Sequence, residues 1–277
     1  MKSDDLHGIY PALPTPLTTE GRPDFQALEA LVHRSLQAGV AGLVPMGGTG
    51  EFTALSNEDR VAVVRHVVEV SKGAVPVLPG VVSPGYKDSV ELGQAYKAAG
   101  ADALMLVTPF YVTPTQAGVK DYFRAYAKQA ELPLVYYDIP ARTGLITAID
   151  TLAELAEDGT IIGVKVCHTD LSYFTRLATT VAGGLSRLSG DDMLYVSHRM
   201  HGAVGGVLAS APMLPRFYVE LDAMITAGDF AGAIAKQLVD GASAHHSANQ
   251  NVSPVRTSRN TYIRKYMYGR KLKQQGQ

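Results

Sequence analysis

Short runs of apolar residues alternate along the chain with longer segments in which apolar residues recur at helical spacing. Apolar runs of about five residues, bounded by turn residues, are typical of strands buried on both faces of a parallel sheet. The longer segments are typical of the helices that cover such a sheet. Eight strands are predicted, at Ile9–Leu13, Gly42–Met46, Val75–Val81, Ala103–Val107, Leu134–Asp138, Ile161–Lys165, Leu185–Ser189 and Val204–Ala209.

The predicted helices carry start and stop signals. Ser56 is followed three residues later by Asp59, a spacing that indicates a capping box, and Gly73 is placed to end the same helix. Thr147 and Asp150 repeat the start signal further along the chain. We therefore expect helices to begin at these two positions.

Eight strand–helix units close most simply into a βα barrel, so the predicted fold class is α/β, an eight-stranded parallel barrel with extra C-terminal helices. An open doubly wound sheet is the alternative, but such sheets usually have a glycine-rich phosphate turn after the first strand. Here Pro14-Thr15-Pro16 follows that strand. No linker divides the 277 residues, and we expect a barrel over 1–225 with a helical extension of the same domain over 226–277.

Charge is distributed unevenly along the chain. The formal net charge is −1, but seven basic residues and no acid follow Asp240, which leaves 18 basic against 26 acidic residues before it. Tyrosines among the basic residues of the tail are compatible with nucleic-acid binding. A solvated helix that covers the acidic body is the preferred interpretation, and no nucleic-acid partner is expected.

The sequence carries few signals for a cellular compartment or for a metal site. The single cysteine, Cys167, excludes an internal disulfide framework and fits a reducing compartment. No uninterrupted run of 18 apolar residues occurs, so a cytoplasmic protein without a membrane partner is expected. His198 and His201 have no third ligand at a recognised spacing, nor do His245-His246, and no metal is expected.

Lys165 ends the predicted strand Ile161–Lys165. Burying an ammonium costs several kcal/mol, so such a side chain either extends to water or gives up its proton and becomes a nucleophile. In a βα barrel, residues at the carboxyl ends of strands converge at one mouth. Polar segments occupy those positions after several strands, namely Gly47–Glu51, Thr108–Tyr111, Tyr137 and Ser189–Asp192.

An imine-forming lysine needs a neutral amine, a proton shuttle and donors for the carboxylate of the substrate. Tyr137 can carry protons, and a glycine-rich turn with the Thr49 hydroxyl can bind an oxyanion. Each part also has a structural interpretation: Tyr137 as a residue lining the barrel, the turn as a tight connection, Cys167 and His168 as a buried thiol and a loop histidine. Together they favour chemistry at Lys165.

Three segments carry a resemblance to a known family. Gly47-Gly48-Thr49-Gly50-Glu51, Tyr137-Asp138-Ile139-Pro140-Ala141-Arg142-Thr143-Gly144 and Ile162-Gly163-Val164-Lys165 resemble, in order and spacing, the dihydrodipicolinate synthase / N-acetylneuraminate lyase family. The resemblance runs from Gly8 to about Arg256. It implies an eight-stranded barrel, no metal or other cofactor, and a pyruvate Schiff base on Lys165.

The resemblance also implies roles for further residues. Tyr137 would relay protons, Tyr111 would reach the relay of a neighbouring subunit, and Thr49 and Gly48 would hold the pyruvate carboxylate. Val207 on the last strand would belong to the same substrate site. Such proteins are usually homotetramers built as dimers of dimers. Arg142 matches the arginine with which the synthases bind the carboxylate of aspartate semialdehyde, and a guanidinium suits that task.

Some positions depart from the synthase pattern. Gly48 replaces a hydroxyl residue of the proton relay, Asp138 replaces an asparagine and Val166 replaces an acid. The predicted function is a Schiff-base lyase that condenses pyruvate with L-aspartate semialdehyde. A 2-keto-3-deoxy sugar-acid aldolase or dehydratase is the alternative, because the Gly48 turn resembles that of related dehydratases. A non-catalytic pyruvate-binding protein is the alternative of another class.

Overall fold

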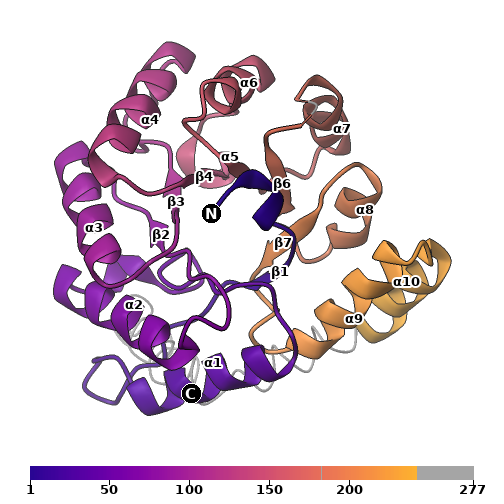
Figure 1. Ribbon diagram of the computed structural model, residues 1–277, viewed down its shortest axis with the longest axis horizontal. Coiled ribbons are helices and arrows are strands. Elements are labelled where there is room, and N and C mark those ends of the chain that lie inside the picture. The colour runs from indigo at the N-terminus through magenta and orange to yellow at the C-terminus, as the bar shows by residue number, and fades with distance from the viewer. Residues whose placement is uncertain (182, 242–277) are drawn as a thin grey trace, which may run out of the picture.

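The computed structural model describes residues 1–181 and 183–241. Within these residues seven parallel strands form one sheet, in the order β1-β7-β6-β5-β4-β3-β2, and helices surround it (Figure 1). Neighbours in the sheet from β2 to β7 are also neighbours in sequence, which excludes the doubly wound alternative. The strands are β1 (Gly8–Pro11), β2 (Gly80–Val81), β3 (Leu104–Val107), β4 (Leu134–Asp138), β5 (Gly163–Val166), β6 (Ser186–Ser189) and β7 (Gly205–Leu208).

The predicted strand Gly42–Met46 is not a strand of the described sheet, so the expected number of eight is not confirmed. Its residues make isolated parallel bridges to both edges of the sheet, Val44 with Ala12 and Leu43 with Val77. Prolines explain why the bridges do not extend into ladders, because a proline has no N–H to donate. The four prolines on these neighbouring segments are Pro11, Pro45, Pro76 and Pro79, and each accepts a hydrogen bond through its carbonyl.

Side chains of the sheet form two separate apolar layers, because successive residues of a strand point to opposite faces. Val135 and Tyr137 of β4 face the interior cluster, together with Met105, Val107, Leu188 and Val207. Leu134 and Tyr136 of the same strand face the outer cluster, against the helices. The interior face therefore carries Tyr137, and the outer face carries its neighbour Tyr136.

Ten α-helices are present in the described residues. Ser56 caps α2 as predicted: its hydroxyl accepts from the Asp59 N–H at 3.1 Å, and Gly73, just past the helix end, has a left-handed φ of 72°. The predicted cap at Thr147 is wrong, because Ala148 precedes α6. The helices are α1 (Phe25–Gln37), α2 (Asn57–Ser71), α3 (Tyr86–Ala98), α4 (Gln116–Ala130), α5 (Pro140–Thr143), α6 (Ile149–Glu157), α7 (Leu171–Thr180), α8 (Tyr195–Met200), α9 (Pro215–Thr226) and α10 (Phe230–Lys236).

The two described ends of the chain lie in different places. The first residues lie across one end of the ring of strands (Figure 1). The Ser186 hydroxyl, at the start of β6, donates to the Leu6 carbonyl at 2.5 Å, so the covered end is the amino end of the strands. Helix α10 packs against α8 and α9. The predicted basic helix over 255–272 lies outside the described residues, and in the described part no helix is long and apolar enough to cross a membrane.

Candidate functional site

Lys165 and Tyr137 lie side by side on adjacent strands. They are register partners of β5 and β4, one residue before the carboxyl end of each strand. Both side chains are buried, with 6% and 5% exposure. The Lys165 Nζ lies 4.3 Å from the centroid of the Tyr137 ring. The lysine therefore does not extend to bulk water, which was the structural alternative for it.

The charge state of Lys165 differs from the sequence-based expectation. Burial lowers the pKa of the Lys165 ammonium, whereas Tyr137 and Cys167 attract it when they are ionised and raise that pKa, which on balance lies above its ordinary value. This direction does not support the neutral amine that the sequence suggested. Burial raises the pKa of the Tyr137 phenol as well, against the opposing effect of the Lys165 charge. Burial therefore favours the uncharged form of the phenol beside the Lys165 amine.

The turn at Gly47–Glu51 faces the tyrosine. A Cβ added at Gly48 would meet one group within 4 Å, the Tyr137 hydroxyl at 3.7 Å. The Gly50 and Glu51 N–H groups close the turn on the carbonyls of Gly47 and Gly48. The N–H groups of Gly48 and Thr49 make no hydrogen bond within the described residues. Two backbone donors are therefore available near the phenol, as binding of an oxyanion requires.

Close packing holds this turn in place. Met46, fully buried, has a left-handed φ of 60°, a conformation that costs a non-glycine residue of the order of 1–2 kcal/mol. A Cβ at Gly50 would lie 2.9 Å from the Met46 nitrogen, and the Thr15 hydroxyl donates to the Gly50 carbonyl at 2.8 Å. Only glycine fits at position 50, which explains part of the glycine pattern in this motif.

Gly190, after β6, forms the other side of the lysine. A Cβ there would lie 3.0 Å from the Lys165 Cε and 2.2 Å from the Cys167 Sγ. Burial raises the pKa of the Cys167 thiol to about 11, so the thiol is uncharged at neutral pH. Asp191 caps the turn before α8 by accepting from the Met193 N–H at 2.9 Å.

The remaining predicted site residues lie at different depths. Val207 is buried in the same interior cluster as Tyr137. Arg142, in α5, is exposed, and its charge lowers the pKa of the Tyr137 phenol as a minor contribution. Tyr111 is 98% exposed with a left-handed φ of 77°, and nothing in the described residues joins it to Tyr137. Its predicted contact with a neighbouring subunit stays a prediction.

A buried polar cluster lies on the outer face of β4, directly behind the lysine–tyrosine pair. Asp138 Oδ2 accepts from His168 Nε2 at 2.9 Å and from the Tyr173 hydroxyl at 3.0 Å. Asp138 Oδ1 accepts from the Thr147 hydroxyl at 3.1 Å, which in turn pairs with the Tyr136 hydroxyl at 2.7 Å. Sequence reasoning missed this cluster and read Thr147 as a cap. The available signal was Asp138 itself, a carboxylate at the end of an apolar run.

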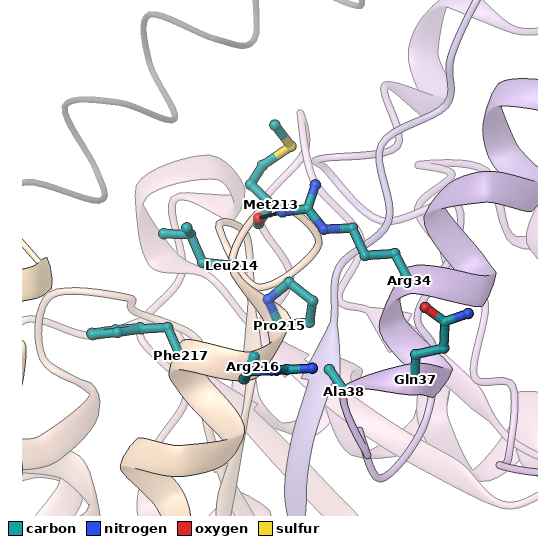
Figure 2. Close-up of a pocket in the computed structure, with 8 residues that line it drawn as sticks. All are labelled: Arg34, Gln37, Ala38, Met213, Leu214, Pro215, Arg216 and Phe217. Atoms are coloured by element: carbon teal, nitrogen blue, oxygen red, sulfur yellow. Dashed lines mark hydrogen bonds between the residues drawn. The ribbon is translucent and has the colours of Figure 1, made fainter.

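Other sites are distinct from this one. A cavity of about 300 Å³ lies between α1 and the start of α9, where the Arg34 Nη2 donates to the Met213 carbonyl at 2.5 Å. Figure 2 shows that Arg216 also faces this cavity and that no residue of the lysine–tyrosine pair lines it. No group of three or more His, Cys, Asp or Glu side chains that could hold a metal ion occurs in residues 1–181 and 183–241.

A sequential parallel sheet ringed by helices, with a buried lysine and tyrosine at the carboxyl ends of two strands, defines a protein of the βα-barrel class. The chain belongs to the dihydrodipicolinate synthetase family, whose model matches residues 5–262.

Named relatives agree with this assignment. A 4-hydroxy-tetrahydrodipicolinate synthase from Sorangium cellulosum is 37% identical over 84% of this chain and 78% of its own length. The dihydrodipicolinate synthase of Acinetobacter baumannii, solved with pyruvate, is 33% identical with a TM-score of 0.80 over 83% of this chain and 79% of its own. A prophage protein of the family from E. coli K12, also solved with pyruvate, is 30% identical with a TM-score of 0.80 over the same shares.

Proposed function

We propose that this protein is a lyase that condenses pyruvate with L-aspartate semialdehyde through an imine on Lys165, as a 4-hydroxy-tetrahydrodipicolinate synthase does. One observation carries the proposal: a buried amine lies over the Tyr137 ring, beside a turn with two unpaired backbone N–H groups. Relatives named as this synthase, at 36–37% identity over more than four fifths of the chain, support the same reaction.

The first half of the reaction forms the imine. The Lys165 ammonium loses its proton to solvent, and the neutral amine adds to the keto carbon of pyruvate. The Gly48 and Thr49 N–H groups, with the Thr49 hydroxyl, hold the pyruvate carboxylate. Tyr137 gives a proton to the departing hydroxyl, which leaves as water, and its ring faces the iminium that forms. Val207 closes the apolar side of the site.

The second half forms the carbon–carbon bond. The iminium withdraws electrons, C3 loses a proton, and the resulting enamine adds to the aldehyde carbon of the second substrate. The aldehyde oxygen takes up a proton, and water then releases the product and regenerates the amine. Arg142, exposed near the mouth, binds the carboxylate of the semialdehyde. Tyr111 would exchange protons with the site of a second subunit.

The proposal extends to architecture. Segment Gly42–Met46, which bridges both edges of the sheet, would serve as the eighth strand of a closed barrel over 1–225, with 226–277 as its helical extension. The protein would work as a dimer or a dimer of dimers, in which the exposed Tyr111 becomes covered. A cytoplasmic location fits the single cysteine of the chain.

A sugar-acid aldolase or dehydratase is the second candidate, and the position of Gly48 favours it. The Tyr137 hydroxyl is the one group within 4 Å of a Cβ placed there, so the turn leaves room beside the phenol for a longer, hydroxylated chain. The same imine on Lys165 would then form from a 2-keto-3-deoxy acid.

The decisive experiment treats the purified protein with pyruvate and borohydride, followed by intact mass measurement and peptide mapping. We expect one reduced pyruvyl adduct per chain, on Lys165. A protein that remains unmodified, while a bona fide aldolase is labelled in parallel, would contradict the proposal and favour a binding protein without turnover.

The substrate is decided by a second assay with the same preparation. Pyruvate consumption that requires the semialdehyde supports the synthase, whereas pyruvate release from 2-keto-3-deoxy sugar acids supports the second candidate. In the synthase case Arg142→Ala should raise the KM for the semialdehyde at least about tenfold, since one charge-assisted contact contributes about 1.5–3 kcal/mol. The pyruvate adduct should form normally in this variant. Unchanged kinetics would remove Arg142 from the site.

A further inference from the structure

Two strands that carry the proposed reacting groups are tied together on their outer face. Tyr137 and Asp138 end β4, Lys165 lies one residue before the end of β5, and His168 follows that strand by two residues. The His168 Nε2–Asp138 Oδ2 contact, 2.9 Å, joins residues 30 positions apart. Beyond the ladder that pairs β4 with β5, a backbone bond joins the same strand ends, from the Cys167 N–H to the Asp138 carbonyl at 2.9 Å.

The contact between Asp138 and His168 is shielded from water. Asp138 is 2% exposed and His168 is 8% exposed, so neither group can exchange its partner for bulk water. Burying a carboxylate without hydrogen-bond donors costs several kcal/mol in folding free energy. Each further donor restricts the orientation of the carboxylate. Tyr173 both donates to Asp138 and stacks on the His168 ring, with centroids 3.9 Å apart and planes 9° from parallel.

The cluster lies outside the reacting site. Asp138 points away from Tyr137, because adjacent residues of a strand face opposite sides of the sheet. His168 follows it on the outer side and contacts neither Lys165 nor Tyr137 through a hydrogen bond in the described residues. The two groups therefore make no hydrogen bond to a reacting group, and they hold the strand ends that bear the phenol and the amine.

We propose that Asp138 and His168 are positioning residues for the Lys165 reaction. Their buried contact supports the carboxyl end of the ladder between β4 and β5, so that the amine and the phenol keep the geometry in which the imine forms. This inference rests on the proposed function, since it requires that Lys165 reacts with pyruvate. A loss of contact of this kind displaces reacting groups without removing any of them, and a displacement of about 1 Å can cost about 100-fold in rate.

The test measures the time course of reductive trapping with pyruvate by intact mass, for the wild type, Asp138→Leu, His168→Leu and the double variant. The rate constant and the final fraction modified are separated. A merely structural role lowers the fraction of competent molecules and leaves the rate constant of the remainder unchanged. A positioning role lowers the rate constant, by about ten- to 100-fold, with full modification at long times.

Two further features sharpen the result. The double variant should be no slower than the slower single variant, because both substitutions break one contact. His168→Gln, which keeps an N–H donor, should recover part of the rate. Asp158→Asn is the matched control: it removes an acid paired with Arg124 at 2.7 Å on the surface, and its rate should equal that of the wild type.

Each outcome has one meaning. Slow but complete modification in the folded single variants supports the inference. Wild-type rate constants in those variants overturn it and leave the proposed function intact, as does a reduced final fraction at an unchanged rate. A wild type that forms no adduct refutes the proposed function, and the inference falls with it. If one substitution prevents folding, as judged by circular dichroism, the other single variant decides by the same criterion.

Discussion

Tyr136 and Tyr137 are adjacent in β4, yet they occupy opposite environments. The Tyr136 ring stacks on Phe123, with centroids 4.4 Å apart, and its hydroxyl pairs with Thr147 at 2.7 Å. The Tyr137 ring faces Lys165 and the turn at Gly48. Burial raises the pKa of both phenols, but the Tyr136 hydroxyl is held by the neutral Thr147 hydroxyl, whereas the side-chain partner of the Tyr137 hydroxyl is the Lys165 amine.

The two faces of the sheet differ in whether their polar groups have hydrogen-bond partners within the protein. On the outer face, Asp138, His168, Thr147 and Tyr173 satisfy one another, as buried polar groups in a stable core must. On the inner face, backbone N–H groups, a phenol and an ammonium converge without enough protein partners. Polar groups without enough protein partners are typical of a site where a ligand supplies the missing hydrogen bonds. This contrast between the two faces indicates the candidate site.

Removal of the Lys165 amine should abolish the chemistry of the inner face. Lys165→Met keeps much of the side-chain volume and removes the charge, so we expect no pyruvate adduct and a loss of turnover by a factor of at least about 1,000. The buried charge is costly, so the variant should unfold at an equal or higher temperature than the wild type. Lys97→Met, at a surface ion pair with Glu131, is the control for loss of a lysine. Labelling of Lys165→Met would place the imine elsewhere.

Removing one hydroxyl from each face should separate chemistry from stability. Tyr137→Phe should lower turnover by about 100- to 10,000-fold, because a proton-transfer group is lost, with little change in unfolding free energy. Tyr136→Phe should lower the free energy of unfolding by about 1–3 kcal/mol, because the buried Thr147 hydroxyl loses one of its two hydrogen-bond partners.

Turnover is measured per folded molecule and stability by urea denaturation. Equal effects of the two substitutions on turnover would contradict the distinction between the faces.

The pH dependence of trapping tests the charge state of the inner face. Because the pKa of Lys165 lies above its ordinary value, the reactive neutral fraction is small at pH 6 and grows with pH. The initial rate of reductive trapping should therefore rise about tenfold per pH unit between pH 6 and pH 9. A rate that becomes constant below pH 8 would show that burial dominates and that the amine is already neutral, as the sequence suggested.

A buried histidine of the outer layer should respond in the opposite sense and affect stability alone. Burial lowers the pKa of His198 from its ordinary 6.5 to about 4, and the ring stacks on Phe174 with its Nδ1 paired to Ser189 at 2.8 Å. Between pH 6.5 and about pH 4, the His198 imidazole binds a proton in the unfolded chain but stays neutral in the folded chain. Stability from this group is therefore present above pH 6.5 and is lost as pH falls toward 4, by up to about 3 kcal/mol.

The measurement is the difference in unfolding free energy between the wild type and His198→Gln at pH 7 and at pH 4.5. The wild type should lose more stability than the variant over this interval. Parallel losses would show that His198 titrates normally in the fold.

Strands were predictable where apolar runs met no proline. The predicted run Leu134–Asp138 coincides with β4, and most other strands differ from their predictions by one or two residues at an end. Gly42–Met46 and most of Val75–Val81 failed as strands because Pro45, Pro76 and Pro79 remove ladder donors, although both segments lie in the expected place. An apolar pattern indicates that a segment is buried, whereas a β-ladder also requires backbone N–H groups that can donate hydrogen bonds.

The site was predictable in part. Lys165, Tyr137 and the turn at Gly48 were expected at one mouth because parallel strands end together, and the register of β4 and β5 brings the first two side by side. The partners of Asp138 were not predictable. His168, Thr147 and Tyr173 come from three separate segments, and a local signal for a helix cap at Thr147 competed with the long-range contact that it makes.

The sequence by itself determined the class of fold, the order of its strands, the family, and which residues could carry chemistry, because periodicity and motif spacing are local properties. The tertiary structure decided which face each residue occupies, which donors remain unpaired, and the direction of the Lys165 pKa. Those properties depend on desolvation and on charges from distant segments, so they arise only when β4, β5 and the turn at Gly48 come together.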